Sequence, residues 1–366
     1  MNLNPIINNF QRPIRKVQIC CILIFSCAAC SLNIPYENQY SDPDAITTVT
    51  AARELLASAY DAIPKPEFSL SVLSDDFQPT FLINLNADLN NLYKWHPKPM
   101  EDLSNSLWEK YYSAIAIANT VLERIHYVSP ISDSDKQELQ CIVSEAKTLK
   151  AYCYFNLLRL FAPTYPEGPE KDGIILKERF ELAFLKRSSI SECVNAIRQL
   201  LTEAVTVDNR PSQVYWFSRQ SAYYLLAALE LYAENYDKAE EYALKILSST
   251  NAYDVLAPVH YKKLWEQEPC EECIFSLHTT NSYYTDMNYE RKKGDYFTIN
   301  STLTQLYAAN DIRYEATVYP QEMPGESIGE TLPVLYLGKY NKQNWNYKPI
   351  QYINKLRVSG ICFIFL

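Results

Sequence analysis

Glycine is scarce in this chain, at only 7 of 366 residues. A sandwich of many short strands needs glycine at its turns, whereas helix interiors disfavour it. Large aromatic side chains are abundant instead, with 29 tyrosines, 14 phenylalanines and 5 tryptophans. The composition therefore favours helices over a turn-rich β-sandwich.

Long apolar runs and blocks of like charge are missing too. No stretch approaches the roughly 18 uninterrupted apolar residues of a membrane-spanning helix, so we expect none. No run of like charge is long enough to form an interaction tail. The formal net charge of -9 argues against a nucleic-acid partner, because phosphate binding requires a basic surface. Apolar residues make up 48% of the chain, enough for a sizeable core.

The common catalytic motifs are absent as well. The chain contains no G-x-S-x-G, no P-loop, no G-x-G-x-x-G and no H-E-x-x-H, and its four histidines stand apart. Asp75 and Asp76 are adjacent in sequence, which does not place two carboxyl groups on either side of a glycosidic bond. We therefore expect neither catalysis nor a cofactor.

Two of the ten cysteines form the motif C-E-E-C at 270–273. Thiolates together with His278 are zinc ligands in type, but the spacing lacks the second ligand pair of a tetrahedral site. We expect no metal here and interpret the motif as a loop entering a strand. A disulfide between Cys270 and Cys273 stays open. The other cysteines have no regular spacing, so this is not a small disulfide scaffold.

The first 30 residues have the pattern of a secretory signal. Three basic residues between positions 12 and 16 precede a short apolar run and then small residues. We interpret 1–29 as a lipoprotein-type signal peptide and Cys30 as the lipidated first residue of the mature chain. The alternative is a cysteine of the signal segment or of the core, since Cys27 stands where such cleavage sites usually carry leucine. Residues 30–45 are polar with two prolines, which predicts an extended tether.

Amphipathic periodicity predicts helices in pairs. Apolar residues recur at helical spacing in 107–125 and in 144–162, and a short acidic turn joins the two segments, as in an antiparallel hairpin. The pattern returns at 189–205 and, as a pair broken at the sequence AENYD, at 218–247. The second pair resembles part of a tetratricopeptide unit, in which small Ala239 permits close helix crossing. Recurring hairpins predict an α-solenoid-like stack.

Other segments differ in character. Residues 63–106 contain five prolines, which predicts a long irregular surface. Short strands are predicted at 272–277, 316–320 and 332–340. The expected fold is mainly α, with tetratricopeptide-like helical hairpins and an irregular face of loops and short strands.

Eight stretches, in order, resemble the SusD/RagB family of outer-membrane nutrient-binding lipoproteins from gut-type Bacteroidetes. The most specific are LWEKYYSAIAIANTVLERI and SEAKTLKAYCYFNLLRLFAPTYP. The others are the front cysteine with its tether, AARELLASAYDAI, LSDDF, LKRSSISECVNAIRQLLTEAV, SRQSAYYLLAALELYAENYDKAEEYALKIL and CEECIFSL. The resemblance implies a single helical body over 46–359. Residues 360–366 are mostly apolar where the family continues into further helices, and we interpret this end as truncated or frame-shifted.

The resemblance also implies a function. It implies a lipid-anchored, surface-exposed and non-enzymatic binding protein of the outer membrane. Its implied partners are a SusC-like TonB-dependent transporter and the glycan, or less often the peptide, that it delivers. Two alternatives remain: a helical-repeat scaffold lipoprotein of outer-membrane assembly without a small ligand, and a glycan-cleaving enzyme. No motif identifies the ligand.

Loop aromatics beside polar residues are the candidates for ligand contact. Sugar rings present flat C–H faces that stack on tryptophan and tyrosine, while their hydroxyl groups bond to polar side chains. The candidates on this pattern are Asp76, Tyr93, Trp95, Tyr283, Tyr284, Trp345 and Tyr347. For each of them, packing onto the body is the alternative. Aromatics in helical segments, such as Trp108 and Tyr111, are expected in the core.

Overall fold

In a computed structural model, the chain divides into two compact units, Met1–Ala45 and Ile46–Leu366. The model describes most of the second unit. The described residues, to which every structural statement below refers, are 46–179, 184–248, 263, 273–277, 296–327, 329–337 and 352–354. The predicted signal peptide, Cys30 and the tether lie outside them.

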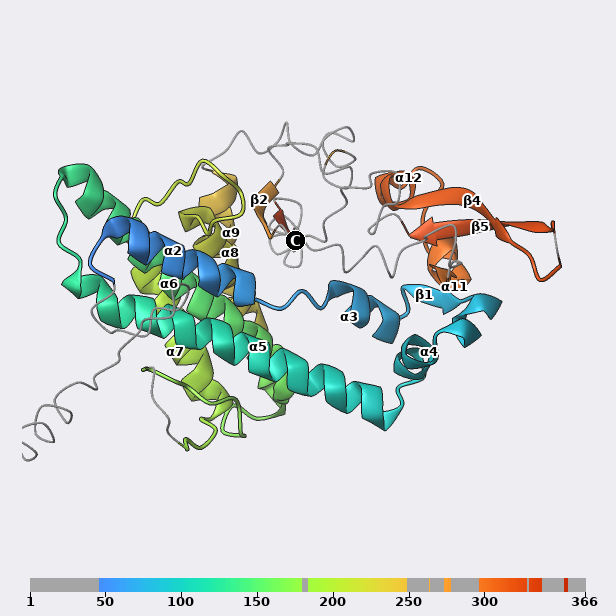
Figure 1. The fold of residues 1–366 in the computed structure, drawn as a ribbon, viewed down its shortest axis with the longest axis horizontal. Coiled ribbons are helices and arrows are strands. Elements are labelled where there is room, and N and C mark those ends of the chain that lie inside the picture. Colours follow the sequence, from blue (N-terminus) through green and yellow to red (C-terminus); the bar gives the residue numbers. More distant parts are fainter. Residues whose placement is uncertain are drawn as a thin grey trace, which may run out of the picture. The chain divides into compact units, whose positions relative to one another are not determined.

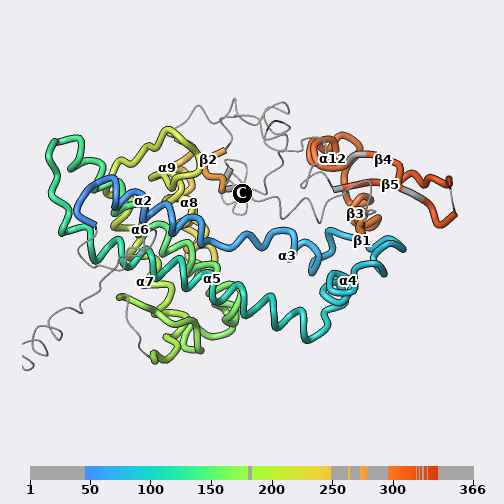
Figure 2. Tube along the Cα trace, in the orientation of Figure 1, coloured from blue at the N-terminus to red at the C-terminus, as the bar shows by residue number. Residues whose placement is uncertain are grey.

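Long helices form the larger part of the described structure (Figure 1). They are α2 (Val49–Ala62), α5 (Pro97–Arg124), α6 (Asp133–Phe161), α7 (Ile190–Ala204), α8 (Arg219–Tyr232) and α9 (Tyr236–Leu247). Each of these helices packs against the next one in this order, as the trace in Figure 2 also shows. The mainly α fold of stacked helical hairpins predicted from the sequence is therefore confirmed.

Two of these helices begin earlier than their periodicity predicts. α5 starts at Pro97 rather than at residue 107, because proline fits the first turn of a helix, where its missing N–H breaks no bond. α6 starts at Asp133 rather than at residue 144. Ser132 and Asp135 form a capping box there: the Asp135 N–H donates to Ser132 Oγ at 3.1 Å, and the Ser132 N–H donates to Asp135 Oδ2 at 3.1 Å.

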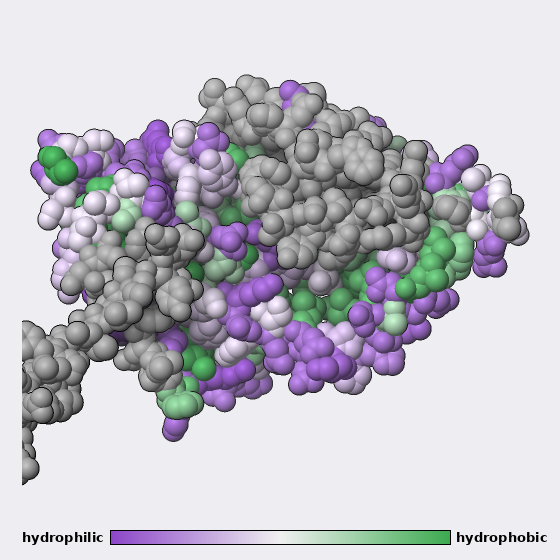
Figure 3. All heavy atoms as spheres, viewed as in Figure 1, coloured by the Kyte–Doolittle hydropathy of each residue, from purple (hydrophilic) through white to green (hydrophobic). Residues whose placement is uncertain are grey.

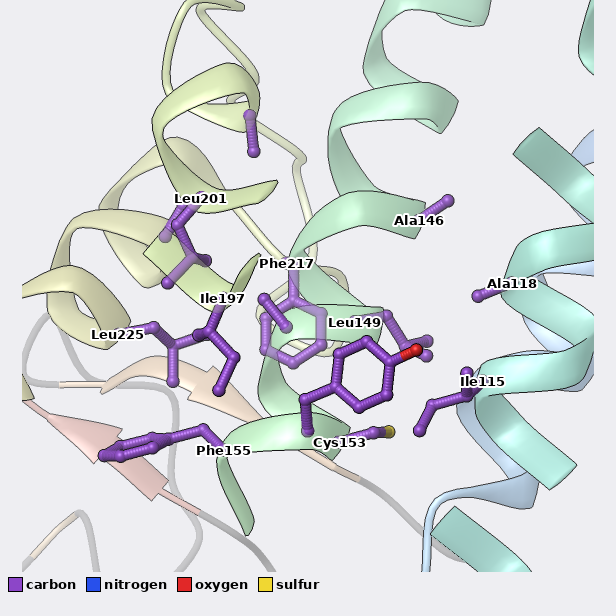
Figure 4. Packing of buried hydrophobic residues seen from close by; sticks show 14 of the residues in the cluster. Ile115, Ala118, Ala146, Leu149, Cys153, Phe155, Ile197, Leu201, Phe217 and Leu225 are labelled. Carbon is purple, nitrogen blue, oxygen red and sulfur yellow. The ribbon is translucent and has the colours of Figure 1, made fainter. Parts of the chain in front are cut away.

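The main core lies between these helices. Figure 4 shows Ile115 and Ala118 of α5 facing α6, with residues of α7 and α8 on the other side of α6. Leu149 in the middle of α6 is fully buried. Tyr111 is also buried, and Trp108 packs against the core half-buried, as expected for helical aromatics. Ala239 is fully buried where α9 meets α8, which fits the close crossing predicted for it.

Shorter elements surround a second, smaller core. They are α3 (Glu67–Leu73), β1 (Phe77–Pro79), η2 (Phe81–Leu85), α4 (Ala87–Tyr93), β3 (Phe297–Ile299), α11 (Ser301–Gln305), α12 (Ile312–Thr317), β4 (Val318–Pro324) and β5 (Thr331–Leu337). We call this cluster the aromatic core. Its buried members are Phe68, Val72, Phe77, Ile83, Phe297, Ile299 and Val318. The prediction that 63–106 is irregular is wrong, because apolar residues in this segment build short elements around that core.

Three short antiparallel pairings complete the described fold. β1 pairs with β3, so that Phe77 lies opposite Ile299. β4 and β5 form a hairpin, and β2 (Cys273–Ser276) pairs with β6 (Tyr352–Asn354). The three predicted strands are thus found with shifted bounds. Short 3-10 turns follow α5 and α6, at Ile125–Tyr127 and Tyr165–Glu167.

An extended segment after α6 is held by tyrosine hydroxyl groups. Tyr112 Oη accepts from the Ile175 N–H at 2.9 Å and donates to the Ile175 carbonyl at 2.8 Å. Tyr154 Oη makes the same two bonds to Lys177, at 2.8 and 2.7 Å. The side chains of α5 and α6 thereby replace a neighbouring strand. On the face seen in Figure 3, the described residues are mainly hydrophilic, with smaller hydrophobic patches between them. Among the described residues, no helix is long and apolar enough to cross a membrane.

Candidate functional site

The end of α4 carries an exposed tryptophan in an unusual backbone conformation. The Trp95 N–H donates to the Leu92 carbonyl at 2.9 Å, and the His96 N–H donates to the Asn91 carbonyl at 2.9 Å. This pair of bonds is the Schellman motif, which ends a helix with one residue in the left-handed region. That residue is Trp95, with φ of 57°.

Glycine is the usual residue at this position, because a side chain there meets its own backbone. A bulky residue with positive φ is uncommon and costs of order 1 kcal/mol or more. The Trp95 side chain is nevertheless 61% exposed, so burial of its indole does not offset that cost. Backbone outliers of this kind cluster at functional sites, which makes Trp95 a candidate for ligand contact.

Two amide side chains lie in the short elements that precede Trp95, Asn84 in η2 and Asn90 in α4. The Asn90 side chain approaches that of Asn84, with 3.4 Å between Nδ2 and Oδ1. The Leu85 side chain next to Asn84 is 72% exposed. We call residues 84–96 the Trp95 platform. It offers a flat apolar ring together with amide donors and acceptors, which suits a ligand with apolar faces and hydroxyl groups.

Tyr93 and Asp76, two other predicted contact residues, make contacts within the protein. Tyr93 is half-buried, and its ring lies 5.8 Å from that of Phe297 in the aromatic core. Asp76 Oδ2 accepts from Ser71 Oγ at 2.8 Å, and the Asp76 carbonyl accepts from the Asn300 N–H at 3.0 Å. Both residues help to hold the segments that carry the platform, and a direct ligand contact for either stays a prediction.

The remaining predicted residues lie outside the described part of the chain. These are the lipidation site Cys30, the tyrosines 283 and 284, Trp345 and Tyr347. Cys270, half of the disulfide left open, lies outside it too. Among the described residues, no group of three or more His, Cys, Asp or Glu is arranged to hold a metal ion.

A second polar site lies in the helical part of the structure. A hollow of about 640 Å³ opens between α2, the first half of α6 and the loop 205–218. We call it the Arg53 hollow. It is lined by Arg53, Ser134, Gln137, Glu138, Cys141, Glu145, Asp208, Asn209, Arg210, Pro211, Ser212 and Trp216.

Glu145 is the centre of a hydrogen-bond network at the floor of the Arg53 hollow. Its carboxylate accepts from Arg53 Nη1 at 2.8 Å, from Tyr60 Oη at 3.2 Å and from Asn209 Nδ2 at 3.2 Å. The Tyr60 hydroxyl in turn accepts from the Phe217 N–H at 2.8 Å, and Asn209 Nδ2 also donates to the Phe217 carbonyl at 2.9 Å. These bonds tie α2, α6 and the loop 205–218 together.

The network holds a charge away from water. The Glu145 side chain is only 1% exposed. Burial raises the pKa of its carboxyl group, while Arg53 and the other donors oppose that rise. Burial, and after it the nearby Glu145 charge, raises the pKa of Tyr60 well above its ordinary value. A buried network in which the members bond one another is rigid, so the floor of the hollow is preorganised.

The sequence around Trp216 carries a signal for this second site. The stretch DNRPSQVYWF at 208–217 places Tyr215 and Trp216 beside asparagine, aspartate and arginine. That is the same pattern of loop aromatics beside polar residues that singled out Trp95. Glu145 gave no such signal, because a glutamate in a helix is most often on the surface.

Comparisons with known proteins agree with this architecture. A model of a SusD-like family, described as starch-binding associating with outer membrane, matches residues 35–231. Because this match covers more than half of the chain, the chain belongs to the SusD-like family. The recognition made from the eight sequence stretches is confirmed.

The individual proteins that the chain resembles share only 18–25% of its residues in the aligned parts. SusD-like protein P38 of Formosa agariphila is 25% identical over 232 residues, which are 61% of this chain and 42% of that protein. The chain thus matches less than half the length of this curated relative. A SusD superfamily structure from Bacteroides vulgatus superposes with a TM-score of 0.68 at 18% identity, covering 86% of this chain and 74% of that one. A laminarin-binding SusD-like protein gives 0.64 at 20% identity, covering 86% and 79%. These structures share the fold.

Proposed function

We propose that this chain is a non-enzymatic glycan-binding protein of the cell surface, which captures oligosaccharides and passes them to a TonB-dependent outer-membrane transporter. In this proposal residues 1–29 are a signal peptide, Cys30 carries the lipid anchor, 30–45 form the tether and 46–359 form one binding body. Membership of a family described as starch-binding and associated with the outer membrane supports it, as does the laminarin-binding protein that shares the fold.

The observation that carries the proposal is the exposed indole of Trp95. A tryptophan held at a helix end in the backbone conformation usual for glycine, and left 61% exposed, offers the ligand an apolar surface. A rigid aromatic ring loses little conformational freedom when a sugar stacks on it. The neighbouring amide groups then bond to sugar hydroxyl groups and set the orientation of the ligand.

The experiment compares Trp95→Gly with the wild type. Glycine removes the ring but suits the left-handed backbone, so the variant should be as stable as the wild type or more stable. Its affinity for a bound oligosaccharide should fall by about 1–2 kcal/mol, or roughly 5- to 30-fold in Kd. Isothermal titration with starch, laminarin and their oligosaccharides measures the affinity, and thermal melting measures the stability. Leu306→Ala, at a 77% exposed side chain on another element, is the matched control.

Other outcomes of the same titrations would contradict the proposal. Unchanged affinity in Trp95→Gly would remove the platform from the binding site. Release of reducing sugar from any glycan of the panel would make the protein an enzyme. Absence of binding across a broad glycan panel, with an outer-membrane partner retained in pull-downs, would favour the scaffold.

A further inference from the structure

We propose that the Arg53 hollow is a second binding site of this chain, for a short neutral saccharide, separate from the Trp95 platform. The ligand class rests on the proposed function, whereas the site follows from the geometry of the hollow. Its volume of about 640 Å³ falls within the range of roughly 300–1,000 Å³ that small-molecule sites occupy. It is built from α2, α6 and the loop 205–218, none of which contributes to the platform.

The floor of the hollow keeps its shape without a ligand. Glu145 bonds to side chains of α2 and of the loop, and Arg53 is fixed between Glu145 and Glu138. The Arg53 guanidinium also lies over the Trp216 ring, 5.0 Å from its centroid. A preorganised site pays little ordering entropy when a ligand binds.

Hydrogen-bonding groups above this floor are only partly used by the protein. Glu138 bonds Arg53 through Oε1, and Asp208 bonds Arg210 and Arg219 through Oδ1. Within the described part of the chain, the second oxygen of each carboxylate makes no protein hydrogen bond. Amide and hydroxyl groups on the rim, at Gln137, Ser134 and Ser212, add both donors and acceptors.

This mixture of groups favours a neutral ligand rich in hydroxyl groups. Each hydroxyl both donates and accepts, so it can meet a carboxylate oxygen on one side and an arginine or amide N–H on the other. An apolar ligand would leave these polar groups without partners, which costs about 1–3 kcal/mol for each. The lining has three carboxylates against two arginines, so an anionic ligand meets a small excess of like charge.

Ring stacking contributes little here, in contrast to Trp95. The guanidinium of Arg53 covers one face of Trp216, and the ring of Tyr60 meets it at 88° with 4.9 Å between centroids. Trp216 is therefore part of the wall, and hydrogen bonds hold the ligand. A hollow of about 640 Å³ has room for a short saccharide.

Cys141 makes the proposal testable, because it is half-buried in the wall of the hollow. Burial, followed by the nearby glutamates, raises the pKa of its thiol, so alkylation is measured at mildly alkaline pH. The full chain is treated with iodoacetamide with and without maltotriose or laminaritriose, and the peptide carrying Cys141 is quantified by mass spectrometry. A trisaccharide bound in the hollow should slow alkylation by a factor of about 1 + [L]/Kd, where [L] is the free trisaccharide concentration. At ten times Kd this factor is roughly tenfold.

Two variants separate this proposal from the proposed function. Ser212→Trp, at an exposed position on the rim, should abolish the protection of Cys141 and leave binding at the platform intact. Trp95→Gly should weaken platform binding and leave the protection intact. A galacturonate trimer should protect less than the neutral trisaccharides.

The other outcomes show whether the second site, or the proposed function as well, is wrong. If Cys141 is alkylated equally fast with and without trisaccharide while Trp95-dependent binding is measured, the second site is wrong and the proposed function stands. If neither trisaccharide protects Cys141 or binds the platform, and no glycan of a broad panel does, both fail. Should Ser212→Trp fail to fold, the wild-type protection still decides.

Discussion

The main core and the aromatic core are stabilised in different ways. The main core is built largely by helices that are neighbours in sequence, each packed on the next, and Phe275 of β2 joins it from a later segment. The aromatic core is built by short elements from two distant segments, which meet at the pairing of β1 with β3. The elements around the aromatic core should therefore open more easily than the long helices. The ligand surface that we propose at Trp95 belongs to the part that should open more easily.

The largest effect is expected at Phe297, which occupies the centre of the aromatic core. Its ring lies 5.2 Å from that of Phe77 and 5.8 Å from that of Tyr93. Phe297→Ala should cost about 3–5 kcal/mol of the stability of these elements. Hydrogen exchange should show lost protection in β1, β3 and α4, with α5 and α6 unchanged, and binding at Trp95 should be lost. Simultaneous loss of exchange protection in all helices would show that the two cores unfold as one. Leu306→Ala, at an exposed side chain, is the control.

The corresponding change in the main core is Leu149→Ala. Leu149 is fully buried in α6, so the truncation should cost about 2–5 kcal/mol. Here we expect the midpoint of urea denaturation to fall for the helices as a whole, because α6 contacts α2, α5, α7 and α8. Leu244→Ala, at a half-exposed position in α9, should change stability by less than about 0.5 kcal/mol. A purely local loss of exchange protection around residue 149 would contradict the cooperative body.

The two cores also differ in how well they could be predicted from the sequence. The reason is that one is built mostly from neighbouring segments and the other from distant ones. Buried positions of α6 such as Ala146, Leu149 and Cys153 recur at helical spacing, so local periodicity was sufficient to find the helical pairs. The aromatic core has no such local pattern, because Phe77 and Phe297 become neighbours only when distant segments pair. The segment 63–106 was therefore predicted to be irregular, although it forms short elements and the first turns of α5.

Candidate site residues were only partly predictable for a related reason. The pattern of a loop aromatic beside polar residues, here Lys94, made Trp95 a candidate. A left-handed backbone at a tryptophan cannot be inferred from propensity, which disfavours it. The Arg53 hollow depends on an ion pair between α2 and α6 and on bonds from Asn209 in a later loop. Such a network requires the tertiary arrangement of three segments.

Burying the charged side chain of Lys150 should destabilise the helical body. Because this electrostatic cost depends on pH, a pH series separates it from the hydrophobic contribution to stability. Lys150 in α6 is 7% exposed and makes no ion pair with any described residue. Burial lowers the pKa of Lys150 to about 8, against the nearby charges of Glu178 and Glu123, which raise it. Between about pH 8 and 10.5 the unfolded chain then binds more protons than the folded chain, so wild-type stability should rise with pH across this window.

Lys150→Met removes this titration. Below about pH 8 the variant should be more stable than the wild type, by up to roughly 3 kcal/mol, and the difference should shrink towards pH 10.5. Urea denaturation at several pH values measures it. Lys147→Met, which removes a partly exposed ion pair with Glu203, should change stability by about 1 kcal/mol or less. Parallel pH profiles for wild type and Lys150→Met would contradict the depressed pKa.

The smallest expected effect compares the same loss in both regions. Asn86 caps α4, a helix of 7 residues, by accepting the Leu89 N–H at 3.1 Å. Ser132 caps α6, a helix of 29 residues, through the Asp135 N–H at 3.1 Å. Replacing either with alanine should cost about 1 kcal/mol of local stability.

The consequences should nevertheless differ. In Asn86→Ala, amide exchange in α4 should become roughly fivefold faster, because a short helix opens locally by the amount that its cap contributes. Affinity at the Trp95 platform should fall with it, since Trp95 is positioned by the end of α4. In Ser132→Ala, exchange should quicken only in the first turn of α6, because buried residues hold the rest of that helix, and binding should not change. Equal losses of binding in the two variants would mean that the platform depends on the stability of the whole chain and not on the local helix that carries Trp95.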